Sequence, residues 1–333
     1  MVRARRIADV AAAAGVSPTT VSHALSGKRA VSDATRDRIM RAIADLDYRP
    51  NLVASGLRKQ RTHSIALLVA DIANPYYPAV ARAVHDGVSQ AGYVTFIGNT
   101  DGEPDAERAL LQEMLARGVD GVIMQALSTS PAELRDIVGP GFPLVVISDP
   151  DVPLVADAVS TDDADGIAEA VKMLAEADLR EIAFVSGPLG RTPGTIRLAA
   201  FRAAAHVLGI QVREDWVTHT AFTRDGGFAA ATALLSSAER PRAVLCANDL
   251  IAIGVLDAAR AAGLRVPEDL AVVGFDDIET ADLVTPRLTT VSNPAALTGT
   301  ACARALLRRL EHGPDAPYER YSLSTHLVRR ASA

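Results

Sequence analysis

Residues 7–25 of the chain read IADVAAAAGVSPTTVSHAL. The first part predicts a short helix, because apolar side chains recur at the spacing of one helix face: Ile7, Val10, Ala11 and Ala14. Gly15 predicts the end of that helix, since glycine commonly follows a helix C-terminus. Ser17 can cap a second helix, and Pro18 fits its first turn, where no backbone donor is lost. Two short helices joined by so tight a turn indicate a helix-turn-helix, whose second helix enters the major groove of DNA; an ordinary helical hairpin is the alternative.

The charge of the chain is unevenly distributed. Residues 1–62 hold 12 Lys and Arg against 5 Asp and Glu, a net charge of +7. The remaining residues hold 22 against 35, a net charge of −13, which gives the −6 of the whole chain. A basic head on an acidic body indicates that the head meets a polyanion, although a charge run can also be a solvated face.

Length and composition indicate a protein of two or three domains. The chain has 333 residues, of which 49% are hydrophobic, enough for a packed core. No apolar run approaches the roughly 18 residues of a membrane span, and the basic N-terminus MVRARRIADV lacks an apolar signal core. Cys246 and Cys302 are far apart and are expected to be reduced thiols. We therefore expect a cytoplasmic protein.

Two further elements follow the opening pair of helices. Ser32 can cap a third helix with Ile39, Ile43 and Leu46 on its buried side, and Pro50 predicts its end near residues 48–49. Residues 50–59 could form at most two helical turns, too short to be stable alone in water. This segment is either a linker or a helix that folds only when something else orders it.

From residue 64 onwards the sequence alternates between strand and helix. The predicted strands are 65–70, 93–98, 121–125, 144–148, 159–161, 182–186, 217–220, 243–247 and 271–274, and the predicted helices are 80–91, 105–117, 134–138, 164–176, 197–208, 226–235 and 251–262. The short apolar strands are typical of a parallel sheet buried on both faces. This pattern predicts doubly wound α/β units, and its restart after residue 161 predicts two lobes with a cleft between them.

The body lacks the motifs of the common enzyme classes. Its strand-to-helix junctions, including 71–75 and 187–190, show no G-x-G-x-x-G, and the chain has no P-loop, no G-x-S-x-G and no close His/Cys cluster. We therefore expect no catalytic residues, no metal and no cofactor.

Polar residues gather where the predicted strands end, which is where open α/β sheets bind ligands. They are Asp71, Asp149, Asn248 and Asp276, and Arg197 lies at the head of a predicted helix. Carboxylate, amide and guanidinium groups can clamp the hydroxyls of a sugar-like molecule, and Tyr76 and Phe222 could stack on its apolar face. Each of these residues alone could equally be a satisfied loop residue.

Residues 7–58, IADVAAAAGVSPTTVSHALSGKRAVSDATRDRIMRAIADLDYRPNLVASGLR, resemble the head and hinge of LacI/GalR-family transcriptional regulators without gaps. The resemblance implies that Ser17 opens the recognition helix, that Pro18, Thr19 and His23 read bases, and that Leu57 wedges into the minor groove. His23 replaces an Arg common in the family, so an Arg-to-guanine contact is not expected. The expected phosphate contacts are Arg6, Thr20, Ser22, Asn51 and Arg58.

The resemblance continues through ADIANPYY, NTDGEPDAER, RGVDGVI, FVSGP, CANDLIAIGVLDA, GLRVPEDLAVVGFDDI and TPRLTTVSNP. It implies a periplasmic-binding-protein-like core with an effector held by Asp149, Arg197, Phe222, Asn248 and Asp276, together with Tyr76 and Asn293. It also implies crossings between the lobes near Ser160, Val291 and Tyr321. The expected domains are a head at 1–49, a hinge at 50–62 and a core at 63–333, with lobe one at about 63–160 and 292–320 and lobe two at about 161–290 and 321–333.

The expected function is sequence-specific DNA binding by a repressor whose operator affinity is set by a sugar-like effector in the cleft. Pro150 stands where the family commonly has Arg, and RTPGT replaces the usual polar loop before Arg197, so the effector's identity stays open. No leucine heptad follows THLVRRASA, so a homodimer on a near-palindromic operator is expected. A solute-binding module without DNA function is the competing class. Induction or corepression, the operator and the regulated genes are not predicted.

Overall fold

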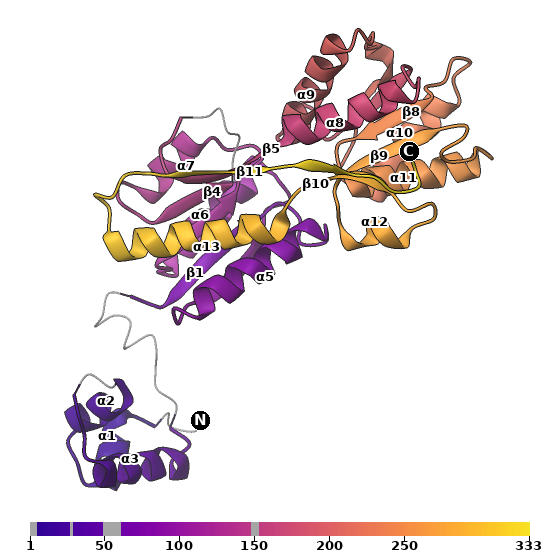
Figure 1. Ribbon diagram of the computed structural model, residues 1–333. Helices are drawn as coiled ribbons and strands as arrows, with labels where there is room; N and C mark the ends of the chain where they lie inside the picture. The colour runs from indigo at the N-terminus through magenta and orange to yellow at the C-terminus, as the bar shows by residue number, and fades with distance from the viewer. Residues whose placement is uncertain (1–4, 27–28, 49–60, 148–152) are drawn as a thin grey trace. The chain divides into compact units, whose positions relative to one another are not determined.

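The computed structural model describes residues 5–26, 29–48, 61–147 and 153–333 (Figure 1). The chain divides into two compact units, Met1–Thr62 and His63–Ala333. They are called the head and the core below, and each is described by itself. No helix in the described ranges is long and apolar enough to cross a membrane.

The head contains three short helices: α1 (Ile7–Ala14), α2 (Pro18–Ser26) and α3 (Asp33–Asp45). Val10, Val21 and Ile39, one from each helix, have no exposed surface and form the centre of its core. Gly15 adopts a left-handed backbone with φ of 64°, and its N–H bonds to the carbonyls of the last turn of α1. A residue without Cβ adopts this conformation at low cost, so glycine permits the tight turn into α2.

The core consists of two lobes, each built on a six-stranded sheet. The sheet of lobe one has the order β11-β5-β4-β3-β1-β2, and the sheet of lobe two has the order β12-β10-β9-β8-β6-β7. The strands of lobe one are β1 (Ser64–Val69), β2 (Val94–Asn99), β3 (Gly121–Gln125), β4 (Leu144–Ile147), β5 (Asp157–Asp162) and β11 (Arg320–Ser324). Those of lobe two are β6 (Ile182–Ser186), β7 (Val217–His219), β8 (Ala243–Cys246), β9 (Ala271–Asp276), β10 (Thr289–Ser292) and β12 (His326–Val328). Neighbouring strands are parallel except β10 and β12.

Helices cover both faces of each sheet, as the doubly wound prediction requires. Lobe one carries α5 (Tyr76–Ser89), α6 (Pro104–Ala116), α7 (Pro131–Val138) and α13 (Ala295–His312). Lobe two carries α8 (Asp163–Glu176), α9 (Gly194–Val207), α10 (Arg224–Leu235), α11 (Asp249–Ala261) and α12 (Glu279–Leu283), with a 3-10 turn at Glu214–Trp216. Although far apart in sequence, α13 and α5 pack side by side in lobe one (Figure 1).

The side chains of β1 show why this strand is apolar throughout. Ile65 and Leu67 belong to the hydrophobic cluster that includes α5 and α13, whereas Ala66 and Leu68 belong to the cluster beneath α6 and α7. All four side chains are fully buried. A strand buried on both faces reads as a continuous apolar run, which is the signal that the sequence shows.

The chain passes between the lobes three times. The family resemblance implies crossings near Ser160, Val291 and Tyr321. In the structure β5, β10 and β11 end at Asp162, Ser292 and Ser324, one to three residues further on. Residues 321–324 therefore lie in the sheet of lobe one, not in lobe two. The cause is register pairing: β11 continues alongside β5 until its last residue, Ser324, pairs with Asp162.

Several helices begin earlier than the apolar pattern predicts. Helix α5 starts at Tyr76 rather than at residue 80, because the side chain of Asn74 accepts a hydrogen bond from the Tyr76 N–H. Helix α11 likewise starts at Asp249, where Asn248 is its N-cap. In the head, α3 ends at Asp45 rather than near residue 48, and Asp47 adopts a positive φ of 44°. At α5 and α11 a polar side chain fixes the start of the helix.

Candidate functional site

The first turn of α2 presents polar side chains to solvent. Ser17, Pro18 and Thr19 are exposed, and Thr20, Ser22 and His23 are half-buried. The Ser17 hydroxyl accepts a hydrogen bond from the Thr20 N–H at 3.1 Å, which fixes the start of the helix. Arg6, before α1, is also exposed. The sequence-predicted contacts at Asn51, Leu57 and Arg58 lie outside the described residues.

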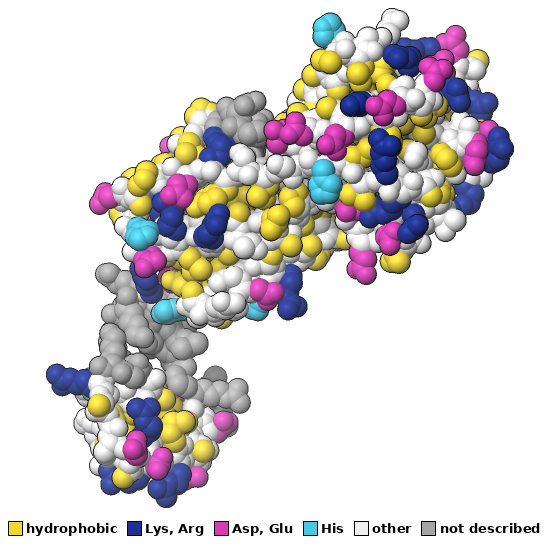
Figure 2. All heavy atoms as spheres, in the orientation of Figure 1, with side chains coloured by type: hydrophobic (Ala, Val, Ile, Leu, Met, Phe, Trp, Pro, Cys, Tyr) yellow, Lys and Arg dark blue, Asp and Glu magenta, His cyan; other side chains and the backbone are white. Residues whose placement is uncertain are grey.

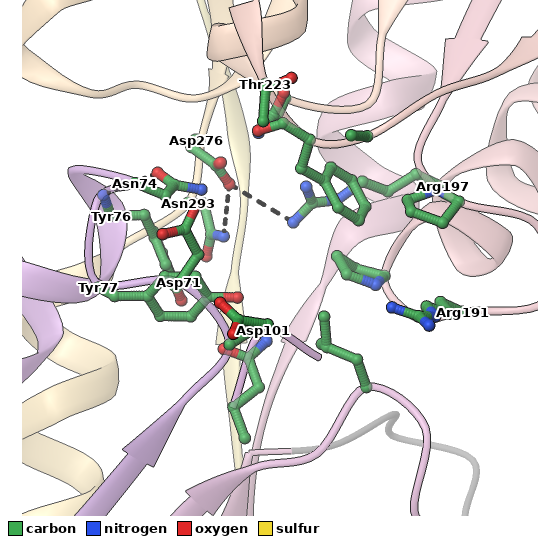
Figure 3. Close-up of a pocket in the computed structure, with 18 of the residues that line it drawn as sticks. Asp71, Asn74, Tyr76, Tyr77, Asp101, Arg191, Arg197, Thr223, Asp276 and Asn293 are labelled. Atoms are coloured by element: carbon green, nitrogen blue, oxygen red, sulfur yellow. Dashed lines mark hydrogen bonds and ion pairs between the residues drawn. The ribbon is translucent and has the colours of Figure 1, made fainter. Parts of the chain in front are cut away.

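A cavity of about 530 Å³ lies between the two lobes of the core (Figure 3). Lobe one lines it with residues that follow its strands, such as Asp71, Tyr76 and Gln125. Lobe two lines it with Arg197 in the first turn of α9 and with residues that follow its strands, such as Phe222 and Asn248. This size is typical of a pocket for a small molecule. Of the predicted effector residues, the cavity brings together Asp71, Tyr76, Arg197, Phe222, Asn248, Asp276 and Asn293, whereas Asp149 lies outside the described residues.

The most buried charge at this cavity is Arg197, in the first turn of α9. Its Nε donates to Asp163 Oδ2 at 2.9 Å, and its Nη1 donates to the Ala247 carbonyl at 2.6 Å. Its Nη2 lies 3.5 Å from Asp276 Oδ1, and the guanidinium carbon is 3.6 Å from the centre of the Phe275 ring. Burial lowers the pKa of Arg197, but Asp163 and Asp276 raise it by more, so the side chain stays charged.

Asp276 links this guanidinium to lobe one. It ends β9 with a φ of 112°, a left-handed value rare for a residue other than glycine, and such strain is common at binding sites. Asn293 Nδ2 donates to Asp276 Oδ1 at 3.0 Å, and Figure 3 shows Asn293 and Arg197 converging on this carboxylate. Burial raises the pKa of Asp276 to about 6, against the lowering effects of Arg197 and Asn293. The carboxylate is therefore ionised near neutral pH.

Side chains cap three of the helices that begin at the wall of the cavity. The side chain of Asn248 accepts from the Ile251 N–H at the start of α11, and Thr223 accepts from the Gly226 N–H at the start of α10. The side chain of Asn74 accepts from the Tyr76 N–H at the start of α5. These bonds satisfy backbone donors that a helix terminus leaves unpaired.

Apolar side chains form another part of the lining. Phe222 packs over Gly187, where a Cβ would lie 2.0 Å from the ring, so only glycine fits beneath it. Leu127 and Leu189 also line the cavity, and Leu189 is 79% exposed. Tyr76 is 7% exposed and meets Tyr77 edge-on at 5.4 Å between ring centroids. Burial raises the pKa of the Tyr76 hydroxyl, which stays protonated. The lining therefore combines polar groups with surfaces on which a ring can stack.

Two contacts join the lobes directly beside the cavity. Arg191 of lobe two donates from Nη2 to Glu103 Oε1 of lobe one at 2.8 Å. Thr192 donates to the Leu127 carbonyl at 3.4 Å. Both donors belong to the RTPGT segment, which the sequence marked as unusual. This segment therefore contributes contacts that depend on how the lobes are placed.

The cavity also has lining residues that sequence reasoning did not single out. They are Asn74, Tyr77, Asp101, Glu103, Gln125, Leu127, Leu189, Arg191 and Thr223. Asp101 and Gln125 lie at or just after strand ends, so the rule that found Asp71 could have found them. The ion-pair partner Asp163, which follows β5, carried the same signal. Among the described residues no group of three or more His, Cys, Asp or Glu could hold a metal ion.

Comparison with known proteins matches both units. Residues 6–51 match the model of bacterial regulatory proteins of the lacI family, and residues 171–333 match a periplasmic binding protein-like domain. The ribose operon repressor of Escherichia coli is 34% identical over 327 residues, which cover 98% of each chain.

Among the solved structures that resemble the whole chain are two that were determined with a bound ligand. The transcriptional regulator CelR in complex with cellobiose is 32% identical and aligns with a TM-score of 0.74, covering 99% of this chain and 100% of that one. The lac repressor dimer bound to operator and the anti-inducer ONPF is 26% identical, with a TM-score of 0.90 over 99% of both chains. With a matching head, a matching two-lobed core and a relative at this identity along nearly its full length, the chain belongs to the LacI family of bacterial transcriptional regulators.

Proposed function

We propose that this DNA-binding regulator is a cytoplasmic repressor that holds a near-palindromic operator as a homodimer and responds to a sugar-like effector. Within the head, residues 1–49 are proposed to be the DNA-binding domain and residues 50–62 the hinge, and the core is 63–333. The observation that carries the DNA-binding role is the exposed first turn of α2 on a head with a net charge of +7. The core has a binding role and no catalytic one.

On DNA, the exposed residues Pro18 and Thr19, together with the half-buried His23, are proposed to reach base edges in the major groove. Arg6 is proposed to hold the phosphate backbone, as are Thr20 and Ser22. Base contacts select the sequence, whereas phosphate contacts add affinity at every sequence. The hinge residues Asn51, Leu57 and Arg58 keep the roles that the family resemblance implies.

The dimer is proposed to form through apolar side chains that both lobes expose. Ile72 and Ile97 of lobe one are each 55% exposed, and Leu283 on α12 of lobe two is 73% exposed. Strand β2, which carries Ile97, is an edge strand that pairs with β1 alone. Exposed apolar surface beside an open sheet edge favours pairing with another chain. Figure 2 shows further hydrophobic side chains on the face of lobe one that carries α5 and α13.

The effector is proposed to occupy the cavity between the lobes. Asp276, Asn293 and Arg197 bring acceptors and donors to one point, as recognition of adjacent hydroxyls requires. Phe222 offers a ring face nearby. Two relatives named above concern ribose and cellobiose, which supports a sugar as the class of ligand. Asp71, Tyr76, Asn248 and Asp149 complete the proposed site.

Effector binding is proposed to alter how the lobes close. The chain crosses between them beside β5, β10 and β11, so a rotation at these crossings moves lobe one relative to lobe two. This rotation would form or break the Arg191–Glu103 ion pair and the Thr192–Leu127 hydrogen bond. Because lobe one continues into the hinge, its movement is proposed to change operator affinity. Such coupling is reciprocal, so operator DNA must change effector affinity by the same factor.

Operator selection in vitro with the purified full-length chain tests the proposal. The chain should enrich a near-palindromic sequence from random duplexes, with an affinity that falls steeply with salt. Repeating the selection with a panel of sugars should change the yield for at least one sugar. His23→Ala should alter the enriched sequence, whereas the matched control His326→Ala, at an exposed residue of β12 in lobe two, should not. Failure to enrich any sequence would contradict the DNA-binding role and favour a solute-binding module.

A further inference from the structure

The cations around the cavity are already neutralised. In the described part of the lining they are Arg191 and Arg197. Arg191 pairs with Glu103 across the lobes, and Arg197 pairs with Asp163 and lies 3.5 Å from Asp276. An anionic ligand would have to compete with these carboxylates for each guanidinium. Separating the buried Arg197–Asp163 pair is costly, whereas the Arg191–Glu103 pair is partly exposed and weaker.

Two further carboxylates face the cavity without a cationic partner among the described residues. Asp71 Oδ1 accepts from the Ala73 N–H at 2.8 Å, and Asp101 Oδ1 accepts from Asn99 Nδ2 at 2.6 Å. Figure 3 shows both on the side of the cavity opposite Arg191. With Glu103 and Asp276 the described lining holds four carboxylates against two guanidinium groups. The sequence of residues 148–152, SDPDV, adds no Lys, Arg or His.

Three of the helix N-termini at the cavity already have a side chain bonded to a backbone donor, whereas α6 and α9 have no side-chain cap, and α6 begins at the carboxylate of Glu103. A helix start is a ready anion site because its first N–H groups point outward. At α5, α10 and α11 a side-chain oxygen of Asn74, Thr223 and Asn248, respectively, already accepts one of these donors. A phosphate would have to displace that oxygen.

The unsatisfied groups in the wall are acceptors. Asn293 is 6% exposed, and because its Nδ2 donates to Asp276, its Oδ1 is left buried without a partner among the described residues. Gln125 Oε1 is likewise buried without a hydrogen-bond partner among the described residues. A buried acceptor without a donor costs free energy, so a ligand that brings hydrogen-bond donors relieves both. Hydroxyl groups donate, whereas an ionised phosphate or carboxylate only accepts.

We propose that the effector is a polyhydroxyl compound that carries neither a phosphate nor a carboxylate group. Its hydroxyls donate to Asn293, Gln125 and the carboxylates, and they accept from the N–H groups of Arg197 that its three partners leave free. This inference rests on the proposed effector role of the cavity. It separates free sugars and glycosides from phosphorylated sugars and sugar acids, which share the same hydroxyl pattern.

Matched sugars test the proposal by thermal denaturation and titration calorimetry of the full-length chain. The probes are ribose with ribose 5-phosphate, glucose with glucosamine, gluconate and glucose 6-phosphate, and cellobiose. A ligand that binds the folded state raises Tm. We expect at least one neutral sugar to raise Tm and its anionic counterpart to bind at least about tenfold more weakly. An anionic member that binds more tightly than its neutral parent would overturn the proposal, as would a panel in which no sugar binds.

A variant that removes two charges tests whether Asp71 and Asp101 cause the preference for neutral over anionic sugars. In the double variant Asp71→Asn, Asp101→Asn each amide oxygen can still accept the hydrogen bond now made by the carboxylate. The ratio of the dissociation constants of the anionic and neutral sugars should fall by about tenfold. Asp178→Asn removes a 96% exposed carboxylate side chain on lobe two and should leave the ratio unchanged. An unchanged ratio in the double variant would refute the role of Asp71 and Asp101.

The proposed function and the inference about ligand charge are tested by different measurements. If the chain selects no DNA sequence, the regulator role fails while the preference for neutral sugars is still measured by calorimetry. If operator selection succeeds but a phosphorylated sugar is the tighter ligand, only the inference about ligand charge fails.

Discussion

Arg197 on α9 and Asp163 at the start of α8 form a buried ion pair, with Nε 2.9 Å from Oδ2 and each side chain 5% exposed. The pair joins two helices of lobe two, and the free side of the same guanidinium faces the cavity. Arg197 therefore has a structural role as well as a role at the ligand site. For any variant of Arg197, both the free energy of unfolding and the effector affinity must therefore be measured.

Replacing Arg197 separates the two roles. Arg197→Ala leaves Asp163 and Asp276 as buried carboxylates without their cation, which should lower stability by about 3–5 kcal/mol. Arg197→Lys keeps the charge but loses the planar fork, so effector affinity should fall at least about tenfold while operator binding persists. Calorimetry and mobility-shift assays measure the two effects. Arg202→Lys, an exposed residue of the same helix paired with Glu214, is the matched control and should change neither.

The pKa of Asp276 predicts a pH dependence of effector binding. Burial raises the pKa to about 6 from an unfolded value of 3.8, so the folded state holds the proton more tightly. This residue's contribution to the free energy of unfolding is therefore largest below 3.8 and declines as pH rises to about 6. If the ionised carboxylate accepts a hydroxyl of the ligand, affinity at pH 5 should be about tenfold below its plateau at pH 7 to 8.

The control for that profile is Asp276→Asn. The amide keeps an acceptor but does not titrate in this range, so the fall in affinity below pH 6 should disappear. A variant that kept the same pH profile would assign the titration to another group.

The head and most of the individual strands could be predicted from the sequence because their signals are local. Gly15 is required at a left-handed turn, and the apolar run of β1 is buried on both faces. Strand β11 was not predicted from the pattern, because its sequence RYSLS is partly polar and half exposed. It forms because it pairs with β5, more than 150 residues earlier in the chain. Such pairing leaves no local signal.

The same limit applies to the candidate site. The rule that polar residues at strand ends bind ligands found Asp71, Asn248 and Asp276, which line the cavity. It missed Asp163, whose importance depends on its contact with Arg197 across 34 positions of sequence. The pairing between Arg191 and Glu103 was likewise invisible, because it joins two different lobes. Sequence position indicates which residues reach the cleft but not which charged residues form ion pairs there.

The hinge expectation can be tested although residues 49–60 lie outside the described part of the structure. If Leu57 wedges between base steps at the centre of the operator, Leu57→Ala should weaken operator binding at least about tenfold, since the bend would lose its apolar wedge. Effector affinity should stay unchanged. Val207→Ala, at an exposed residue of α9 in lobe two, serves as the control. Equal operator affinity of Leu57→Ala and the parent chain would refute the wedge role.

The Arg191–Glu103 pair predicts how lobe closure contributes to effector affinity. Glu103→Gln keeps the size of the side chain but removes the charge that Arg191 of lobe two contacts at 2.8 Å. The Glu103 side chain is 57% exposed, so the pair should contribute no more than about 1 kcal/mol, or about a fivefold change in affinity. If the pair favours the closed lobes that hold the effector, the variant should bind the effector two- to fivefold more weakly, with a smaller difference at high salt. Asp105→Asn removes a more exposed pair with Arg108 inside lobe one and should leave the affinity unchanged. An equal loss in both variants would trace the effect to net charge rather than to lobe closure.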